Sequence, residues 1–357
     1  QTFQGILFKR KDLKYFKRWD LKMGINEKPA QLKPNDYASD QEVRWCPGCG
    51  DYAILNAVKR TLADHQADKA NTVFVSGIGC SSRLPYYMST YGFHTIHGRA
   101  PAFATGIKIT NPELDVWVIT GDGDSLSIGG NHFIHLFRRN LNCQILLFNN
   151  EIYGLTKGQA SPASRTGTIS PSTPKGSLES PLSACELALS SGATFVARGV
   201  DTAIKQLVPT LSKAKEHKGT ALVEIFQNCI VYNDNVFNSF TEKSAAIERQ
   251  IHLENGKPML FGEDNTKGLS LSADHSKLEV IDLKINKKEE SKILIHDESN
   301  KIIAYLLSQM NQSTMPIALG VLYSTEKPTL DSYYTHRIEE HKNKISNIME
   351  KGQTWTI

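Results

Sequence analysis

Between residues 41 and 240, the hydrophobic positions follow two alternating patterns. Short runs that are apolar throughout indicate buried strands, and amphipathic stretches between them indicate helices. Strands are expected within 71–80, 115–130, 143–154 and 219–229, and helices at 51–65, 101–111, 131–140, 181–192 and 201–217. Apolar strands separated by helices predict an α/β fold: a doubly wound, mostly parallel sheet with helices on both faces.

The pattern changes on either side of this region. Residues 1–40 are polar and basic and are expected to form an extension. Residues 241–357 are more charged and predict a smaller C-terminal α+β segment, with strands at 278–285, 291–297 and 316–324 and helices at 301–310 and 334–351. Within the central region, residues 158–181 are rich in Ser, Thr, Pro and Gly and show no periodicity. A loop of this length inside a compact domain is usually functional.

Composition and charge narrow the class of protein. With 40% hydrophobic and 22% charged residues over 357 positions, the chain has a globular rather than a disordered composition. A net charge of +4 is too small for a dedicated nucleic-acid binder. The sequence shows neither a run of eighteen apolar residues nor a signal-peptide pattern. We therefore expect a cytoplasmic protein without a membrane anchor.

Two polar residues lie where consecutive predicted strands end. Asp122 stands in the glycine-flanked turn GDGD, and Asn150 follows it by 28 residues in the stretch LLFNNEIYG. One helix separates them, as a parallel crossover requires, so the two side chains should lie close together. Carboxylate and amide oxygens are suitable ligands for Mg²⁺, which keeps its other positions for water and phosphate.

The spacing of GDG and NN resembles the motif of thiamine-diphosphate enzymes. This resemblance implies that Asp122, Asn150 and the carbonyl of Ile152 bind Mg²⁺. It also implies that four further residues line the diphosphate: Gly123, Asp124, Gly154 and Leu155. The alternative is that Asp122 caps the following helix and Asn149–Asn150 forms a turn. Because both halves of the motif fall at strand ends, we favour the metal site.

Four of the six cysteines stand at the ends of predicted segments, where side chains are free to converge: Cys46, Cys49, Cys80 and Cys229. Four thiolates fit tetrahedral zinc or a [4Fe–4S] cluster. One C-x-x-C with two distant cysteines is less typical of zinc than two close pairs, and a thioredoxin-like pair would have no use for the distant two. Spacing thus favours the cluster but leaves zinc open. Cys143 and Cys185 are expected to be small buried hydrophobes.

Five long motifs occur in the order found in the β subunits of 2-oxoacid:ferredoxin oxidoreductases, which the chain resembles over residues 41–240. They are WCPGCGDYAIL, GIGCSSRLP, HGRAPAFATGIK, GDGDSLSIGGNHFIHLFRRN and NNEIYGLTKGQASP. The segment PNDYASDQEVRWCPGCG is most similar to the 2-oxoglutarate branch. The resemblance implies a thiamine-diphosphate domain that oxidises 2-oxoglutarate with coenzyme A to succinyl-CoA and CO₂, reversibly, passing electrons through a cluster to ferredoxin. A pyruvate or broad-specificity enzyme is the alternative.

The resemblance also implies roles for individual residues. The [4Fe–4S] ligands would be Cys46, Cys49, Cys80 and Cys229, and the thiamine diphosphate would be lined by Ile78, Gly79, Cys80, Ser81, His97, Gly98, Arg99 and Ala100. Arg83 is predicted to pair with a substrate carboxylate, since guanidinium suits bidentate binding, although an ordinary salt bridge is an equal alternative. Lys157 resembles a position tied to coenzyme A, or it contacts the diphosphate.

A partner subunit follows from the same resemblance. In this family the glutamate that activates the pyrimidine ring comes from an α subunit, so we expect the chain to be inactive alone and to work as a heterodimer or a dimer of heterodimers. The C-terminal segment would contact that subunit or cover the active site. A non-catalytic metal-binding scaffold would not need both GDG and NN. A non-oxidative thiamine decarboxylase would not need four cysteines.

Overall fold

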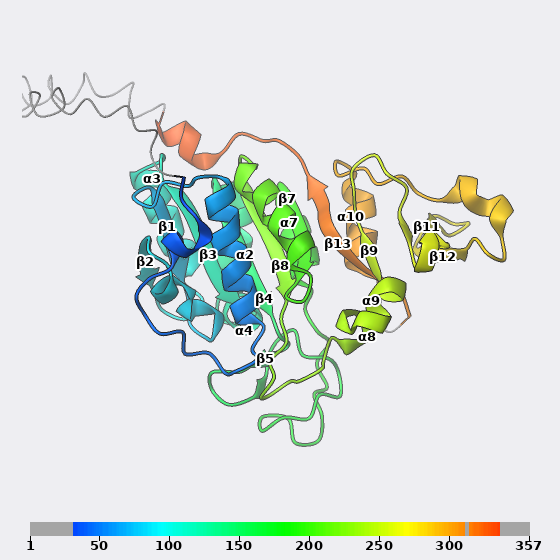
Figure 1. Ribbon diagram of the computed structural model, residues 1–357, viewed down its shortest axis with the longest axis horizontal. Helices are drawn as coiled ribbons and strands as arrows, with labels where there is room; N and C mark the ends of the chain where they lie inside the picture. Colours follow the sequence, from blue (N-terminus) through cyan, green and yellow to red (C-terminus); the bar gives the residue numbers. More distant parts are fainter. Residues whose placement is uncertain (1–30, 311–313, 336–357) are drawn as a thin grey trace, which may run out of the picture. The chain divides into compact units, whose positions relative to one another are not determined.

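The computed structural model describes residues 31–310 and 314–335, and its main feature is a sheet of eight strands (Figure 1). From one edge to the other, the strands are β2 (Tyr91–His94), β1 (Thr72–Ser76), β3 (Asp115–Gly121), β4 (Cys143–Asn149), β8 (Thr220–Phe226), β7 (Phe195–Val200), β13 (Ile317–Ser324) and β9 (Gln250–His252). The first six are parallel, β13 is antiparallel to β7, and β9 is parallel to β13. The predicted α/β fold is confirmed.

Helices cover the sheet in two groups. α2 (Asp51–Asp64) packs against α7 (Ile204–Glu216), whereas α3 (Ala100–Thr110), α5 (Gly130–Arg139), α6 (Ala184–Ser190) and α10 (Lys301–Ser308) form a separate chain of contacts. The predicted apolar face of α2 is buried, with Ile54, Val58 and Leu62 fully inaccessible. Burying one such side chain contributes about 1.5–3 kcal/mol. The central strands are buried along their whole length, because helices lie on both sides of them.

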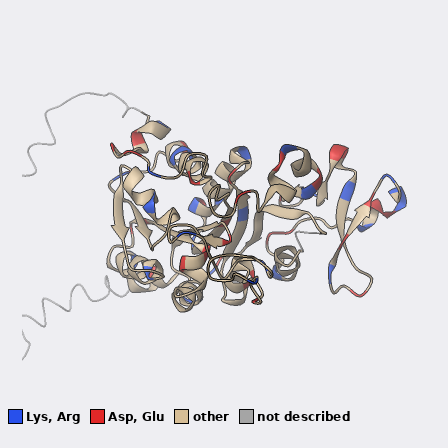
Figure 2. Ribbon diagram, turned by 90° about the horizontal axis from the view of Figure 1, so that it is seen from below, with Lys and Arg blue, Asp and Glu red and all other residues tan. Residues whose placement is uncertain are grey.

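Charged residues of both signs are interspersed along helices and loops, and the main sheet carries few of them (Figure 2). Arg198 on β7 and Glu224 on β8 are an exception: they stand opposite each other and form a buried ion pair at 2.8 Å. Burial alone would raise the pKa of Glu224, but the charge and hydrogen bond of Arg198 lower it. No described helix is long and apolar enough to cross a membrane.

Two strands after residue 240, β9 and β13, join the main sheet, so the sheet continues past the boundary expected there. The same part of the chain forms an antiparallel sheet of β10 (Leu260–Phe261), β11 (Lys267–Leu271) and β12 (Leu278–Asp282), and the short helices α8 (Asn238–Thr241) and α9 (Lys243–Arg249) precede it. The predictions of a helix at 301–310 and of strands at 278–285 and 316–324 are confirmed.

The prediction of a strand at 291–297 is wrong. A 3₁₀ helix, η4 (Lys287–Lys292), occupies its start, and Ile295 forms only an isolated bridge with Pro258. The two hydrogen bonds that flank this bridge, Met259 N to the Leu294 carbonyl and His296 N to the Lys257 carbonyl, are both present at 2.8 Å, but the pairing extends no further. Of the helix predicted at 334–351, all residues after 335 lie outside the described residues. Residues 1–30 of the extension predicted at 1–40 also lie outside them.

The carboxyl ends of four parallel strands lie side by side and carry the polar motifs. The register pairs Ser76 with Ile119, Gly121 with Phe148, and Asn149 with Phe226. The turns that follow β1, β3, β4 and β8 therefore all leave the sheet on the side of its carboxyl strand ends. Open parallel sheets bind their ligands on this side.

Candidate cofactor and metal site at the strand ends

Asp122 is a buried carboxyl group at the start of α4 (Asp122–Leu126), directly after β3. It is 2% exposed, and the Ser161 hydroxyl donates to its Oδ2 at 2.5 Å. Burial raises the pKa of Asp122 to about 7, although Ser161 and the backbone N–H groups of Gly123 and Asn150 favour the charged form. A cation would stabilise such a carboxylate. The N-cap position of α4 is Gly121, and Asp122 is the first residue of the helix.

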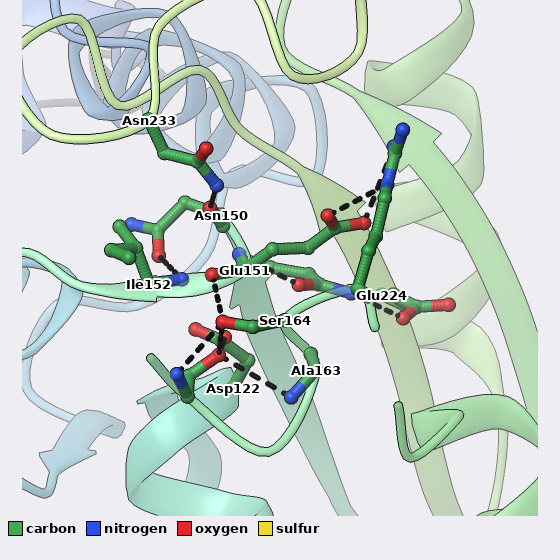
Figure 3. Close-up of polar contacts among 11 residues, drawn as sticks. Asp122, Asn150, Glu151, Ile152, Ala163, Ser164, Glu224 and Asn233 are labelled. Atoms are coloured by element: carbon green, nitrogen blue, oxygen red, sulfur yellow. Dashed lines mark hydrogen bonds and ion pairs between the residues drawn. The ribbon is translucent and has the colours of Figure 1, made fainter. Parts of the chain in front are cut away.

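Asn150 lies next to Asp122, and Figure 3 shows its side-chain oxygen bonded to the backbone N–H of Ile152. Its Oδ1 accepts from the backbone N–H of Ile152 at 3.2 Å, and its Nδ2 donates to Gln227 Oε1 at 2.8 Å. The sharp turn behind it places Glu151 at a φ of 54°, and Asn233 donates to the Asn150 carbonyl at 2.9 Å. The predicted ligands Asp122, Asn150 and Ile152 are thus brought to one place.

The oxygen atoms that Asp122, Asn150 and Ile152 could offer as metal ligands suit magnesium better than a metal that needs several charged ligands. No group of three His, Cys, Asp or Glu side chains within residues 31–310 and 314–335 lies close enough to hold a single ion. Asp122 supplies one carboxylate, while an amide and a carbonyl would complete the protein's share. Mg²⁺ is commonly bound by one or two carboxylates, with water and substrate phosphate filling the remaining positions.

A cavity of about 150 Å³ opens beside these residues. It is lined by the three predicted metal ligands and by most of the residues predicted to bind thiamine diphosphate: Ile78, Gly79, Cys80, Ser81, His97, Gly123, Asp124, Gly154 and Leu155. Gly123 must lack a side chain, because a Cβ atom there would lie 2.2 Å from the Tyr153 ring. This backbone-lined cradle fits a bound diphosphate.

Three residues predicted for this cavity do not line it. The Arg99 guanidinium donates to the Ile128 carbonyl at 2.9 Å, and Ala100 is buried at the start of α3. Gly98 has a φ of 71° and directs its N–H to Asp124. These residues shape the loop that carries His97, and the structure places none of them at the cavity wall.

Asp124 holds two cofactor loops together, a function that the sequence did not indicate. Its Oδ1 accepts from the N–H groups of Ile78 at 3.1 Å and Gly98 at 2.7 Å, and from His97 Nδ1 at 2.5 Å. Thr120 donates to Oδ2 at 2.7 Å. Sequence reasoning also missed Ser161 and Gln227, because both reach the site through tertiary contacts.

The four predicted cysteine ligands converge on a second cavity of about 220 Å³. Cys46, Cys49, Cys80 and Cys229 all line it. A Cβ atom at Gly154 would lie 3.5 Å from the Sγ atoms of both Cys80 and Cys229, so these sulfurs flank one backbone position. Cys229 was predicted to end the strand at 219–229, and it lies three residues beyond the end of β8. Cys143 and Cys185 are fully buried in the core, as predicted.

The cysteine cavity is suited to a positively charged metal group. Burial, and then the charge of Asp51, raise the pKa of Cys80 to about 12, and the same two causes raise the pKa of Cys49 further. Free thiolates are therefore disfavoured here, whereas thiolates bound to the iron atoms of a cluster would be stabilised. Arg83 and Lys157 line this cavity rather than the first one, and Arg83 Nε donates to the Tyr87 hydroxyl at 3.1 Å.

The two cavities share Cys80, Asn150, Gly154 and Leu155 in their walls. A group bound by the cysteines would therefore lie next to a group bound at the GDG/NN motif. The family resemblance implied this adjacency, because it places Cys80 among both the cluster ligands and the residues lining the thiamine diphosphate.

Comparison with known proteins agrees with this geometry. Residues 77–225 match the family described as "Thiamine pyrophosphate enzyme, C-terminal TPP binding domain". The match covers β3, β4 and the turns that carry Asp122 and Asn150. Fold, site and match together define a thiamine pyrophosphate-binding domain.

Individual relatives narrow this class. The chain is 44% identical to "2-oxoglutarate oxidoreductase subunit KorB" of Mycobacterium tuberculosis, over 94% of this chain and 91% of that protein. It is 50% identical to "2-oxoacid:ferredoxin oxidoreductase 1, subunit beta" of Aeropyrum pernix, over 53% of this chain and 60% of that protein. A solved structure, "2-oxoglutarate:ferredoxin oxidoreductase from Magnetococcus marinus with 2-oxoglutarate, coenzyme A and succinyl-CoA bound", superposes with a TM-score of 0.71 at 34% identity, covering 90% of this chain and 97% of that one. The chain belongs to the family of 2-oxoacid:ferredoxin oxidoreductase β subunits, and its likeness is to the 2-oxoglutarate branch.

Proposed function

We propose that this chain is the β subunit of a 2-oxoglutarate:ferredoxin oxidoreductase. Together with an α subunit, it would convert 2-oxoglutarate, coenzyme A and oxidised ferredoxin to succinyl-CoA, CO₂ and reduced ferredoxin, reversibly. The observation that carries the proposal is the shared wall between the two cavities, with Cys80 in both. If thiamine diphosphate and an electron-accepting metal cluster occupied these two cavities, the shared wall would place them within short reach of each other.

The residues present fit the groups that this reaction requires. Asp122, Asn150 and the Ile152 carbonyl would hold Mg²⁺, and the four converging cysteines would hold a [4Fe–4S] cluster. When bound, thiamine diphosphate supplies the electron sink for decarboxylation, and the cluster accepts single electrons. The task of Asp124 is to keep the loops of Ile78 and His97 in place around the diphosphate.

Two cations are proposed to contact substrates. Arg83 and Lys157 line the cysteine cavity, with Lys157 exposed in the turn between β5 (Ile152–Tyr153) and β6 (Gln159–Ala160). Both 2-oxoglutarate and coenzyme A are anionic, so positive charge at the mouth of the site favours their binding. We assign Arg83 to a substrate carboxylate, because its planar guanidinium can bind one bidentately, and Lys157 to coenzyme A.

An α subunit is part of the proposal, because the cavity lacks one catalytic group. None of the described residues lining the first cavity is a glutamate. Glu151 stands between the lining residues Asn150 and Ile152 in the sequence, but its Oε2 forms an ion pair with Arg165 Nε at 2.9 Å. The carboxylate that thiamine chemistry needs at the pyrimidine ring would therefore come from the partner.

Steady-state kinetics of the co-purified αβ complex test the proposal. We expect coenzyme A-dependent ferredoxin reduction with a kcat/KM at least tenfold higher for 2-oxoglutarate than for pyruvate, and none from the β chain alone. A preference for pyruvate would replace 2-oxoglutarate by the broader alternative. Full activity of the single chain would remove the α subunit from the account.

A further inference from the structure

Gln227 lies between the two cavities and contacts a predicted ligand of each. It follows β8 directly and is 1% exposed. Its Nε2 donates to Cys49 Sγ at 3.3 Å, and its Oε1 accepts from Asn150 Nδ2 at 2.8 Å. A single amide group thus connects the cysteine cavity with the predicted magnesium ligands.

The surrounding hydrogen bonds fix which end of the Gln227 amide faces which neighbour. Asn150 Oδ1 already accepts from Ile152, so Asn150 must present its NH₂ group to Gln227. The Gln227 oxygen then has to face Asn150, and its NH₂ group faces Cys49 and the Asn228 carbonyl. In the reverse orientation, the oxygen would point at two acceptors, a sulfur and a carbonyl, and the NH₂ group at a donor.

The backbone holds the same residue firmly. Gln227 N donates to the Asn149 carbonyl at 2.9 Å, which extends the β4–β8 pairing by one step. Gly50, beside Cys49, packs closely on Asp201 and Gln227: a Cβ atom there would lie 1.9 Å from Asp201 Oδ2 and 3.0 Å from Gln227 Cγ. The side chain therefore has a defined path from the sheet to the sulfur of Cys49.

We propose that Gln227 is a positioning residue that tunes the cluster and orients the magnesium ligand with the two ends of one amide. This inference rests on the proposed function. An N–H that donates to a ligand sulfur stabilises the more negative, reduced cluster and so raises its reduction potential. At the other end of the amide, Gln227 Oε1 binds the NH₂ group of Asn150. The Asn150 side-chain oxygen therefore points away from Gln227 and is available as a metal ligand.

Two substitutions separate these effects. Gln227→Glu keeps an acceptor for Asn150, removes the donor to Cys49 and adds a negative charge. Gln227→Met is neutral, has a similar length, and removes both contacts. Asn228→Asp is the matched charge control, because that side chain contacts Asp234 and Asn235 rather than Cys49.

The experiment uses the αβ complex, purified without oxygen, with iron and sulfide content matched to the wild type. Potentiometric titration followed by electron paramagnetic resonance gives the midpoint potential of the cluster, and calorimetry of the cofactor-stripped complex gives the affinity for Mg²⁺ with thiamine diphosphate. We expect a more negative midpoint in both Gln227 variants and an unchanged one in Asn228→Asp. Cofactor affinity should fall roughly 10–100-fold in Gln227→Met and less than threefold in Gln227→Glu.

Other outcomes would overturn the inference. A wild-type midpoint in Gln227→Met, which carries no added charge, would show that the N–H does not tune the cluster. An equal shift in Asn228→Asp and Gln227→Glu would reduce the effect to charge alone. One further outcome would instead support the inference: if both Gln227 variants fold but fail to retain the cluster while Asn228→Asp retains it, the hydrogen bond to Cys49 is required for the cluster to bind. A wild-type complex without a cluster would instead defeat the proposed function itself.

Discussion

The Asp124 carboxylate accepts a hydrogen bond from the backbone N–H of Gly98 at 2.7 Å, joining the turn after β3 to the loop after β2. The same oxygen accepts from Ile78, in the turn after β1, so one buried side chain holds three strand ends in register. Gly77 provides the space, because a Cβ atom there would lie 1.9 Å from Asp124 Oδ2. The shape of the cofactor cavity thus depends on a residue that we expected only to line it.

Replacing Asp124 with Asn should loosen both loops. One amide oxygen cannot replace a carboxylate that accepts from Ile78, Gly98, His97 and Thr120, and the new NH₂ group would face donors. We expect a loss of about 1.5–3 kcal/mol in the free energy of unfolding and at least a tenfold weaker affinity for thiamine diphosphate. Chemical denaturation and calorimetry measure the two effects. Asp264→Asn, at an exposed position, is the control, and equal losses in both variants would contradict the assigned role.

Adding one methyl group at Gly123 should block cofactor binding. The new Cβ of Gly123→Ala would lie 2.2 Å from the Tyr153 ring, whose hydroxyl donates to the Gly123 carbonyl at 3.1 Å. Tyr153 would have to move into the cavity or away from its partner. Gly130→Ala is the matched control, since nothing lies within 4 Å of that added atom at the start of α5. Its stability should change by less than about 1 kcal/mol. Titration of both variants with thiamine diphosphate tests this prediction. Normal cofactor binding by Gly123→Ala would contradict the claim that Gly123 must lack a side chain for the diphosphate to bind.

The cysteines should divide into two groups by what their loss removes. Cys229→Ser should eliminate most of the bound iron and sulfide while leaving the fold intact, because the side chain lies in a loop at the cavity wall. Cys143→Ser instead places a hydroxyl in the core at the start of β4 and should lower the free energy of unfolding by about 1–3 kcal/mol with iron retained. Metal and sulfide analysis after anaerobic purification separates the two. Zinc without sulfide in the wild type would favour the zinc alternative.

Acid should destabilise the fold through His217, which is the C-cap residue after α7 and lies beside Thr194 and Phe195. Burial lowers the pKa of His217 from 6.5 to about 4. Between pH 6.5 and pH 4, His217 is protonated in the unfolded chain but stays neutral in the folded one. The free energy of unfolding is therefore unaffected by His217 above pH 6.5 and decreases as the pH falls from 6.5 towards 4. After allowance for partial solvent access, the loss is at most about 1–2 kcal/mol. The pH dependence of unfolding should flatten over this window in His217→Asn, and an unchanged slope would contradict the assignment.

The fold could be predicted where burial is complete. Strands β1, β3, β4 and β8 are buried along nearly their whole length and consist mainly of apolar residues, and these apolar runs are visible in the sequence. β2 was missed because all four of its residues are exposed at the edge of the sheet, so no alternation marks it. The place of β13 beside β7 depends on tertiary contacts that no local pattern encodes.

The site was predictable to the extent that its residues follow strands. Asp122, Asn150 and Cys80 each stand directly after a strand or in the turn that follows it, and parallel pairing brings such positions together. Gln227 also follows a strand, but its partners Cys49 and Asn150 lie 178 and 77 residues away in the sequence. A glutamine has no distinctive chemistry by itself. Only the structure shows that it links the two cavities.

The central claim is that 2-oxoglutarate oxidised at the GDG/NN site passes electrons to the four-cysteine site beside it. The direct measurement mixes the anaerobic αβ complex with 2-oxoglutarate and coenzyme A, without ferredoxin, and follows the electron paramagnetic resonance of the cluster. We predict a reduced-cluster signal in the wild type and none in Asp122→Ala. A cluster that dithionite reduces but 2-oxoglutarate does not, or that only pyruvate reduces, would contradict the account.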